Sequence, residues 1–254
     1  MEALAEDIAS QTLEAGASDM PNLRVAEKPY HHGNLRKALI EAGLAVLEEV
    51  GHAGLTLRAV ASRAGVSHAA PAHHFASAKG LLTVMATSAF ARFEAALADG
   101  RAKTDPDPVS QIRVMGRVYL EFARAHPEQF RLMFTAAKLD WRDAELLAIA
   151  RMTYRHLEEI ARPAADAMGA NSATARTNVE YLIWSVAHGF AHLAIEHQIP
   201  KPGAPVPTDV PDIGGLLFAT AHRGQAGRVK RTKAATVTAG KRNLKPRKSK
   251  AERR

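Results

Sequence analysis

Apolar residues recur every three to four positions along most of the chain, which is the spacing of amphipathic helices. The first such stripe contains Leu35, Leu39, Ala42 and Val46, and its helix is expected to begin near Asn34, a residue type that caps helix N-termini. No segment alternates apolar and polar residues as a half-buried strand does. Further helices are predicted over residues 77–98, 108–126, 127–135, 140–168, 172–198 and 209–222. The sequence therefore predicts an all-α fold.

Residues that begin or end helices punctuate this pattern. Gly51 stands where the first helix needs a left-handed residue at its C-terminus. Asp107 is followed by Pro108, which is the order expected of a capping residue and the first helical position. Pro163 is expected to bend or break the helix over 140–168.

Two short helices are predicted between residues 56 and 75. The first is expected to have Thr56 as its N-cap, and the second to have Ser67 as its N-cap and to end by Phe75. Pro71 would then be the fourth helical residue, where its ring faces Ser67 and not a preceding helical turn. The buried face of the first short helix is expected to contain Leu57, Val60, Ala61 and Ala64.

Negative charge is missing from one region of the chain. The chain has 26 acidic residues, but none lies between Val50 and Phe93. This region contains the stretch LTLRAVASRAGVSHAAPAHHF, with two arginines and three histidines. Two short helices joined by a tight turn are typical of a helix-turn-helix, whose second helix lies in the major groove of DNA. Phosphates would repel an acid there, although acid-free, alanine-rich stretches also occur in ordinary helical cores. Both interpretations fit the short motif.

The side chains of the two short helices suit contact with DNA. Arg58 can form a forked pair with guanine, and the methyl group of alanine can pack on a thymine methyl. Ala61 and Gly65 allow the two helices to cross closely, and Ala69 and Ala70 keep the reading face thin.

A resemblance to a known family covers residues 30–82. This stretch reads YHHGNLRKALIEAGLAVLEEVGHAGLTLRAVASRAGVSHAAPAHHFASAKGLL and resembles the DNA-binding domain of TetR-type (tetracycline-repressor-like) transcriptional regulators. The segments FARAHPEQFRLMF at 122–134 and WSVAHG at 184–189 resemble one C-terminal domain type of these regulators, marked by Trp-x-x-x-His-Gly. The resemblance implies an all-α homodimer with two N-terminal DNA-reading heads and C-terminal ligand and dimer helices.

The resemblance also implies which residues contact DNA. It implies base-edge contacts for Arg58, His68 and Ala69, and it pairs His74 with the following phenylalanine as the family usually does. Many relatives have an aromatic residue where Ala72 stands, and a lysine one position before Lys79. The full set of implied DNA-contacting residues is Thr56, Arg58, Ser67, His68, Ala69, Ala70, His73, His74 and Lys79.

Aromatic residues and methionines behind the reading head are candidates for an apolar ligand cavity, although each of them could equally be part of the core. His188 and His192 lie one helical turn apart and form a possible zinc pair, but no third ligand is evident nearby, so no metal is expected. The candidate cavity residues are Met115, Tyr119, Phe122, Met133, Phe134, Trp141, Met152, Trp184 and His188.

Composition separates the two ends of the chain from its body. Residues 223–254 contain 13 of the 34 lysines and arginines and one acid, Glu252, so they are predicted to be a disordered basic tail. Residues 1–29 are predicted to be a flexible arm without the features of a secretory signal. There is no cysteine and no run of 18 apolar residues, so a cytoplasmic protein without membrane contact is expected. The intervening predicted domains are 30–82 and 83–222.

The sequence thus predicts a ligand-responsive repressor that binds a palindromic operator as a homodimer. Its partners would be double-stranded DNA, a second copy of the chain and an unidentified small apolar or amphipathic effector, with no cofactor. The dimer is expected to form through the helices near 172–198 and 209–222. The alternatives are a non-specific architectural DNA binder driven by the tail, and an enzyme, for which no nucleophile elbow or phosphate-binding glycine loop is present.

Overall fold

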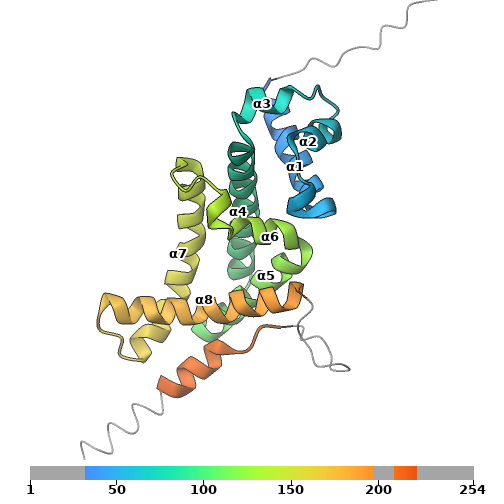
Figure 1. The fold of residues 1–254 in the computed structure, drawn as a ribbon. Coiled ribbons are helices and arrows are strands. Elements are labelled where there is room, and N and C mark those ends of the chain that lie inside the picture. The colour runs from blue at the N-terminus through green and yellow to red at the C-terminus, as the bar shows by residue number, and fades with distance from the viewer. Residues whose placement is uncertain (1–31, 197–208, 222–254) are drawn as a thin grey trace, which may run out of the picture. The chain divides into compact units, whose positions relative to one another are not determined.

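The computed structural model describes residues 32–196 and 209–221, and every regular element in these ranges is a helix (Figure 1). The predicted N-terminal arm and basic tail lie outside the described residues. The predicted all-α fold is confirmed.

The first three helices are α1 (His32–Gly54), α2 (Leu57–Ala64) and α3 (Ala70–Phe75). Gly51 has a φ of 67°, and it separates two helical pieces that are joined within α1, so a left-handed residue was correctly predicted there. The side chain of Thr56 accepts a hydrogen bond from the Ala59 amide and caps α2, as predicted. The predicted N-cap at Ser67 is wrong: α3 begins at Ala70, and the Ser67 carbonyl accepts from the Ala70 amide in a turn. Pro71 therefore lies in the first turn of α3, where its missing N–H costs nothing.

The second part of the chain begins with α4 (Ala78–Ala102), which is capped by Ser77. Asp107 caps α5, Asp143 caps α7 and Ser172 caps α8, each through its side-chain oxygen. These caps supply acceptors for amide groups that have no partner within the helix. The remaining elements are α5 (Pro108–Ala125), α6 (Pro127–Met133), a 3₁₀ turn η1 (Ala136–Lys138), α7 (Ala144–Ala167), α8 (Ala173–Ile195) and a helix over 213–221.

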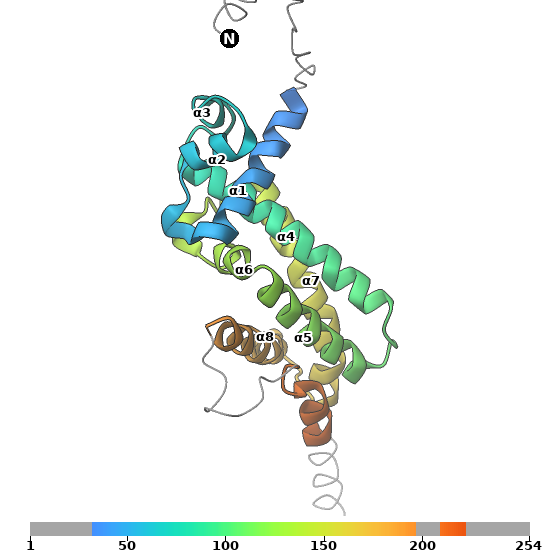
Figure 2. The ribbon, with the colours of Figure 1, turned by 90° about the vertical axis from the view of Figure 1, so that its right-hand side faces the viewer.

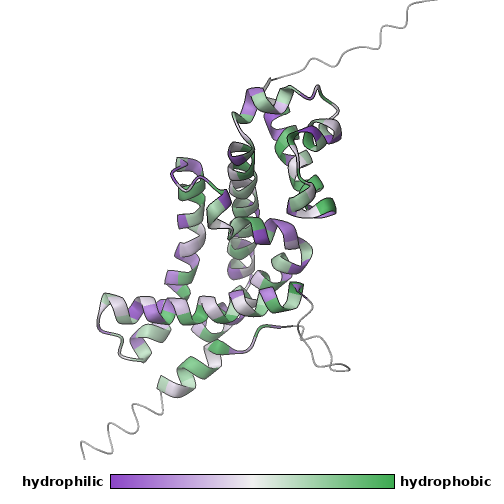
Figure 3. Ribbon diagram, viewed as in Figure 1, coloured by the Kyte–Doolittle hydropathy of each residue, from purple (hydrophilic) through white to green (hydrophobic). Residues whose placement is uncertain are grey.

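Helices α4, α5 and α7 lie side by side, and α8 crosses α5 and α7 (Figures 1 and 2). Helix α7 continues through Pro163, so the helix is not broken there, and the alternative of a bend stays a prediction. Hydrophilic and hydrophobic positions are mixed along α7 and α8, as expected of helices with one buried and one exposed face (Figure 3).

Helix α4 is the central helix of this part of the chain. It contacts α5, α6 and α7, and Leu81, Met85, Phe93 and Leu97 on it are almost fully buried. By length and composition α4 could span a membrane, but a buried core helix passes the same test. Its burial among three neighbours explains its apolar composition without a membrane.

Candidate functional site

Helices α2 and α3 form the helix-turn-helix. Gly65 has a φ of 68°, and its amide and that of Val66 bond back to carbonyl groups near the end of α2, so the chain turns sharply there. Val60, Ala61 and Phe75 are buried and hold the two helices in place. The nine residues implied to contact DNA lie on the outer surface of this unit. Ala70 and His74 are partly exposed. The other seven are exposed: Thr56, Arg58, Ser67, His68, Ala69, His73 and Lys79.

Two interactions restrain side chains on this surface. The hydroxyl of Ser62 lies 3.3 Å from Nε2 of His68, which ties the turn to α2. Arg63 forms an ion pair with Glu49 of α1, so this arginine has a partner, whereas no ion pair holds Arg58 among the described residues. Arg58 is therefore the arginine of α2 that is available to DNA.

The acid-free region of the sequence is less free of acids in space. A surface hollow next to α3 is lined by His73, His74 and Lys79 together with Asp140 and Asp143. The pKa of Asp140 is lowered mainly by the hydrogen bond from the Arg142 backbone amide, and Lys79 adds a smaller attraction. Lys79 therefore lies beside acidic residues that the linear sequence does not place near it.

A mainly apolar cavity of about 350 Å³ lies among α4, α5, α7 and α8. The segment 210–214 also lines it and is tied to α5 by the Arg113–Asp212 ion pair, at 3.0 Å. Aromatic rings form much of the wall, and Phe90 meets both Phe134 and Trp141 edge to face. Its residues include Phe90, Phe93, Leu97, Met115, Tyr119, Phe134, Trp141, Thr153, Tyr154, Leu157, Ile160, Ile183 and Trp184. The volume lies within the range of small-molecule sites.

A polar relay lies at the α5–α8 side of this cavity. The indole N–H of Trp184 donates to the Tyr119 hydroxyl at 3.2 Å, and that hydroxyl lies 2.7 Å from Nδ1 of His188. Burial, with a smaller contribution from His192, lowers the pKa of His188 to about 4, so the imidazole is neutral near pH 7. In the tautomer with the proton on Nε2, Nδ1 accepts a hydrogen bond from the Tyr119 hydroxyl, and all three groups are hydrogen-bonded without any net charge.

The structure places five of the nine predicted cavity residues in the wall: Met115, Tyr119, Phe134, Trp141 and Trp184. The others do not line it. Phe122 packs on Phe93 and His126, and Met133 is fully buried core. His188 lies behind the wall, where it contacts Tyr119, Phe134 and Trp184. Met152 is 44% exposed, because it lies on the outer side of α7 while Thr153 and Tyr154 face inward.

The zinc pair gains no support from the geometry. The rings of His188 and His192 meet edge to face with centroids 4.6 Å apart, and both also pack on Phe130. Within 32–196 and 209–221 no group of three His, Cys, Asp or Glu residues is arranged to hold a metal ion.

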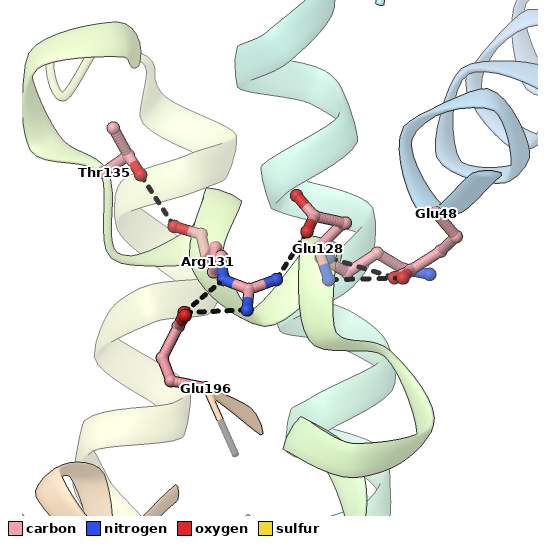
Figure 4. A network of polar contacts seen from close by, with 6 residues as sticks. Glu48, Glu128, Arg131, Thr135 and Glu196 are labelled. Carbon is pink, nitrogen blue, oxygen red and sulfur yellow. Dashed lines mark hydrogen bonds and ion pairs between the residues drawn. The ribbon is translucent and has the colours of Figure 1, made fainter. Parts of the chain in front are cut away.

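Polar contacts join helix α6 to α1 and to the end of α8. The Glu48 carboxylate of α1 accepts hydrogen bonds from the backbone amides of Glu128 and Gln129, at 3.2 and 3.0 Å (Figure 4). Arg131 pairs with Glu128 and donates twice to Glu196, which follows α8. A negative group at the start of a helix is favourable, since the first amides there lack partners.

Two family models match the chain. The model described as "Bacterial regulatory proteins, tetR family" matches residues 39–85, which contain the helix-turn-helix. The model described as "Tetracyclin repressor-like, C-terminal domain" matches residues 112–210, which contain most of the cavity wall. The chain belongs to the TetR family. The Trp-x-x-x-His-Gly mark of its C-terminal domain stays a prediction.

The chain is also similar to one curated protein and to solved structures. HTH-type transcriptional regulator BetI of Stenotrophomonas maltophilia (strain R551-3) is 26% identical over 122 residues, which are 48% of this chain and 62% of that protein. A protein of unknown function from Rhodococcus sp. RHA1 matches 79% of this chain and 98% of its own, with 29% identity and a TM-score of 0.59. A TetR family transcription regulator from Marinobacter aquaeolei VT8 shares the fold at 14% identity, with 75% of this chain and 94% of its own covered and a TM-score of 0.53.

The exposed Arg58 gives this TetR-family head a testable contact. If Arg58 reads a guanine, Arg58→Ala is expected to weaken binding to the cognate site by about 1–3 kcal/mol, with little effect on random DNA. Titration of both DNAs against the wild type and the variant measures the difference. An equal loss on both DNAs would instead identify a phosphate contact.

Proposed function

We propose that the chain is a transcriptional regulator that binds a palindromic operator as a homodimer and is released by a small effector in the α4–α8 cavity. The observation that carries this proposal is the combination, in one chain, of an exposed TetR-type helix-turn-helix and an apolar cavity behind it. The printed name of the BetI relative, a transcriptional regulator, supports the same class. Repression is the proposed direction of control.

A second copy of the chain is the proposed partner for one face of α8. Tyr181, Leu182 and Leu193 on α8 are large and apolar and lie 43–51% exposed. They flank Gly189, where an added Cβ would meet no atom within 4 Å. A two-fold dimer would cover these side chains and would match the symmetry of a palindromic site. Leu216 of the 213–221 helix is also exposed, whereas Ile183 and Leu217 belong to the protomer's own core.

The proposed release is a shift between two dimer populations. A dimer binds two half-sites when its heads are spaced by one turn of DNA, about 34–36 Å. An effector that binds more tightly to a dimer with a different head spacing lowers the affinity of the protein for its operator. The size of this decrease is set by the difference between the effector's affinities for the two dimer states. Helix α6 is the proposed route by which the effector affects the DNA-binding helices. Phe134, which directly follows α6, lines the cavity, and backbone amides at the start of α6 bond to Glu48 of α1.

Footprinting of the full-length protein on genomic fragments tests the proposed function. Protection of a discrete palindromic site, with two symmetric halves, is the expected result. Uniform coating of all fragments would contradict it and would favour the alternative, a non-specific architectural DNA binder driven by the basic tail.

The tail has its own expected effect. Flexible cations add affinity on any sequence, because they touch phosphates and make no fixed base contacts. Each phosphate contact steepens the slope of log affinity against log salt by about 0.9. Deleting residues 223–254, with their 13 basic groups, is expected to flatten that slope by several units and to leave the preferred site unchanged. An unchanged slope would mean that the tail makes no phosphate contacts.

The proposal includes no enzymatic activity, no resident cofactor or metal, and a cytoplasmic location. These parts follow from the regulatory class. A reporter gene placed behind the protected site, assayed with and without the intact regulator, distinguishes repression from activation.

A further inference from the structure

One indole of the cavity wall stands apart from the other polar groups there. Nε1 of Trp141 is buried and has no hydrogen-bond partner among the described residues. Trp141 lines the cavity and meets Phe90 with the two ring centroids 6.4 Å apart. A buried N–H without an acceptor is unfavourable, and native proteins rarely leave one unpaired.

The remaining polar side chains of the wall already have partners within the protein. Tyr119 and Trp184 belong to the relay that ends on His188. Thr153 donates to the Ile149 carbonyl at 3.0 Å, and Tyr154 donates to Glu180 at 2.8 Å. A ligand acceptor that bonds to any of these donors must compete with an existing hydrogen bond, whereas an acceptor beside the Trp141 N–H competes with none.

Among the described residues that line the cavity, no charged side chain is without a partner. Its two ionised wall residues, Arg113 and Asp212, form an ion pair with one another at 3.0 Å. Burial raises the pKa of both Tyr119 and Tyr154, so neither phenol ionises near pH 7. An ionic ligand would lose its hydration here and find no free counter-charge, which is costly.

We propose that this cavity takes uncharged, mainly apolar molecules that carry one hydrogen-bond acceptor, such as a ketone, ester or lactone carbonyl. The Trp141 indole N–H, which has almost no exposed surface in this structure, donates to that acceptor after a small shift of the wall around it. This inference rests on the proposed function, in which the cavity is the effector site. The proposed class of effector, small apolar or amphipathic molecules, is thereby restricted to uncharged ones. The polar end of the effector is placed beside Trp141.

Calorimetric titration of the full-length protein with four one-ring compounds tests the inference. Acetophenone carries the neutral acceptor, cumene has nearly the same shape without it, and benzoate and benzylammonium carry the two charges. Acetophenone is expected to bind about three- to tenfold more tightly than cumene, which is the range of one net hydrogen bond. Both ions are expected to bind at least about tenfold more weakly than acetophenone.

Two tryptophan variants assign the preference to one indole. Trp141→Phe keeps an aromatic ring and removes the N–H, so the affinity ratio of acetophenone to cumene is expected to fall to about one. Trp184→Phe removes an N–H that already has a partner, so this ratio is expected to persist even where both affinities change. Circular dichroism and melting temperature verify that each variant is folded, and the charge comparison in the wild type is independent of both variants.

Several outcomes would overturn the inference: an ion that binds as tightly as acetophenone, a ratio that survives Trp141→Phe, or no binding by any of the four compounds. Footprinting of the same preparation without any compound separates this from the proposed function. A protein that protects a palindromic site but shows no ketone preference overturns the ligand class alone. A protein that prefers the ketone but protects no site overturns the proposed regulator and leaves the cavity chemistry standing.

Discussion

Replacing Gly189 with phenylalanine is expected to convert a dimer into a monomer at micromolar concentration. Gly189 is exposed, and within the described part of the protomer no atom lies within 4 Å of an added Cβ, so the larger side chain can extend outward. In the proposed dimer, however, this position faces the partner between Tyr181, Leu182 and Leu193, where a close approach of two α8 helices leaves no space for a ring. The expected loss is at least about 3 kcal/mol of association free energy, more than a hundredfold in dissociation constant. Sedimentation equilibrium measures it.

A phenylalanine elsewhere on the surface provides the control. Arg151 on α7 is also exposed, so Arg151→Phe adds the same apolar group outside the proposed interface and is expected to leave the dimer intact. Operator affinity should fall with dimerisation in Gly189→Phe, because one head then binds without the other. A Gly189→Phe variant that remains dimeric would place the interface on another face.

Glu48→Ala is expected to lower the free energy of unfolding by about 3 kcal/mol and to release the N-terminus of α6. The carboxylate accepts from two backbone amides, and hydrogen bonds to a charged group contribute about 1.5–3 kcal/mol each before partial exposure is considered. Alanine preserves helix α1, since its helix propensity is high. Urea denaturation measures the stability, and hydrogen exchange at the Glu128 and Gln129 amides is expected to accelerate.

The neighbouring glutamate is a matched control for this effect. Glu49 is on the same helix but pairs with Arg63 across an exposed surface, where ion pairs contribute at most about 1 kcal/mol. Glu49→Ala is therefore expected to leave amide exchange in α6 unchanged. Equal losses in the two variants would mean that the Glu48 contact does not hold α6 to the head.

The helices could be predicted from the sequence wherever a local signal sets their ends. Thr56, Ser77 and Asp107 each cap the helix that begins after them, because a cap depends on residues only three positions away. Ser67 has the same residue type but no cap geometry, because the turn between α2 and α3 places two further residues before α3 begins. Pro163 lies within a long helix whose packing against α4 and α8 outweighs the local break.

The candidate site was less predictable, because its parts come from distant segments. The aromatic side chains Tyr119, Trp141 and Trp184 could be predicted as part of the cavity wall from their residue types. On α7, however, Met152 faces away from the cavity, and its neighbours Thr153 and Tyr154 line it. Residues 210–214 are part of the cavity wall and are tied to α5 by the Arg113–Asp212 pair. This pair joins residues 99 positions apart, so it has no local signal in the sequence. The Glu48 cap of α6 joins residues 80 positions apart and has no local signature.

The two tryptophans of the cavity are the only ones in the chain. Ultraviolet excitation at the red edge of protein absorbance therefore yields emission from the cavity wall alone, without any label. The two indoles differ in their surroundings, since Trp184 donates to Tyr119 while Trp141 finds no acceptor in the part of the chain that the structure describes. An oxygen atom that arrives at Trp141 would shift its emission to longer wavelength and leave that of Trp184 in place. The tryptophan fluorescence of the purified protein therefore reports whether the cavity is occupied and how polar its occupant is.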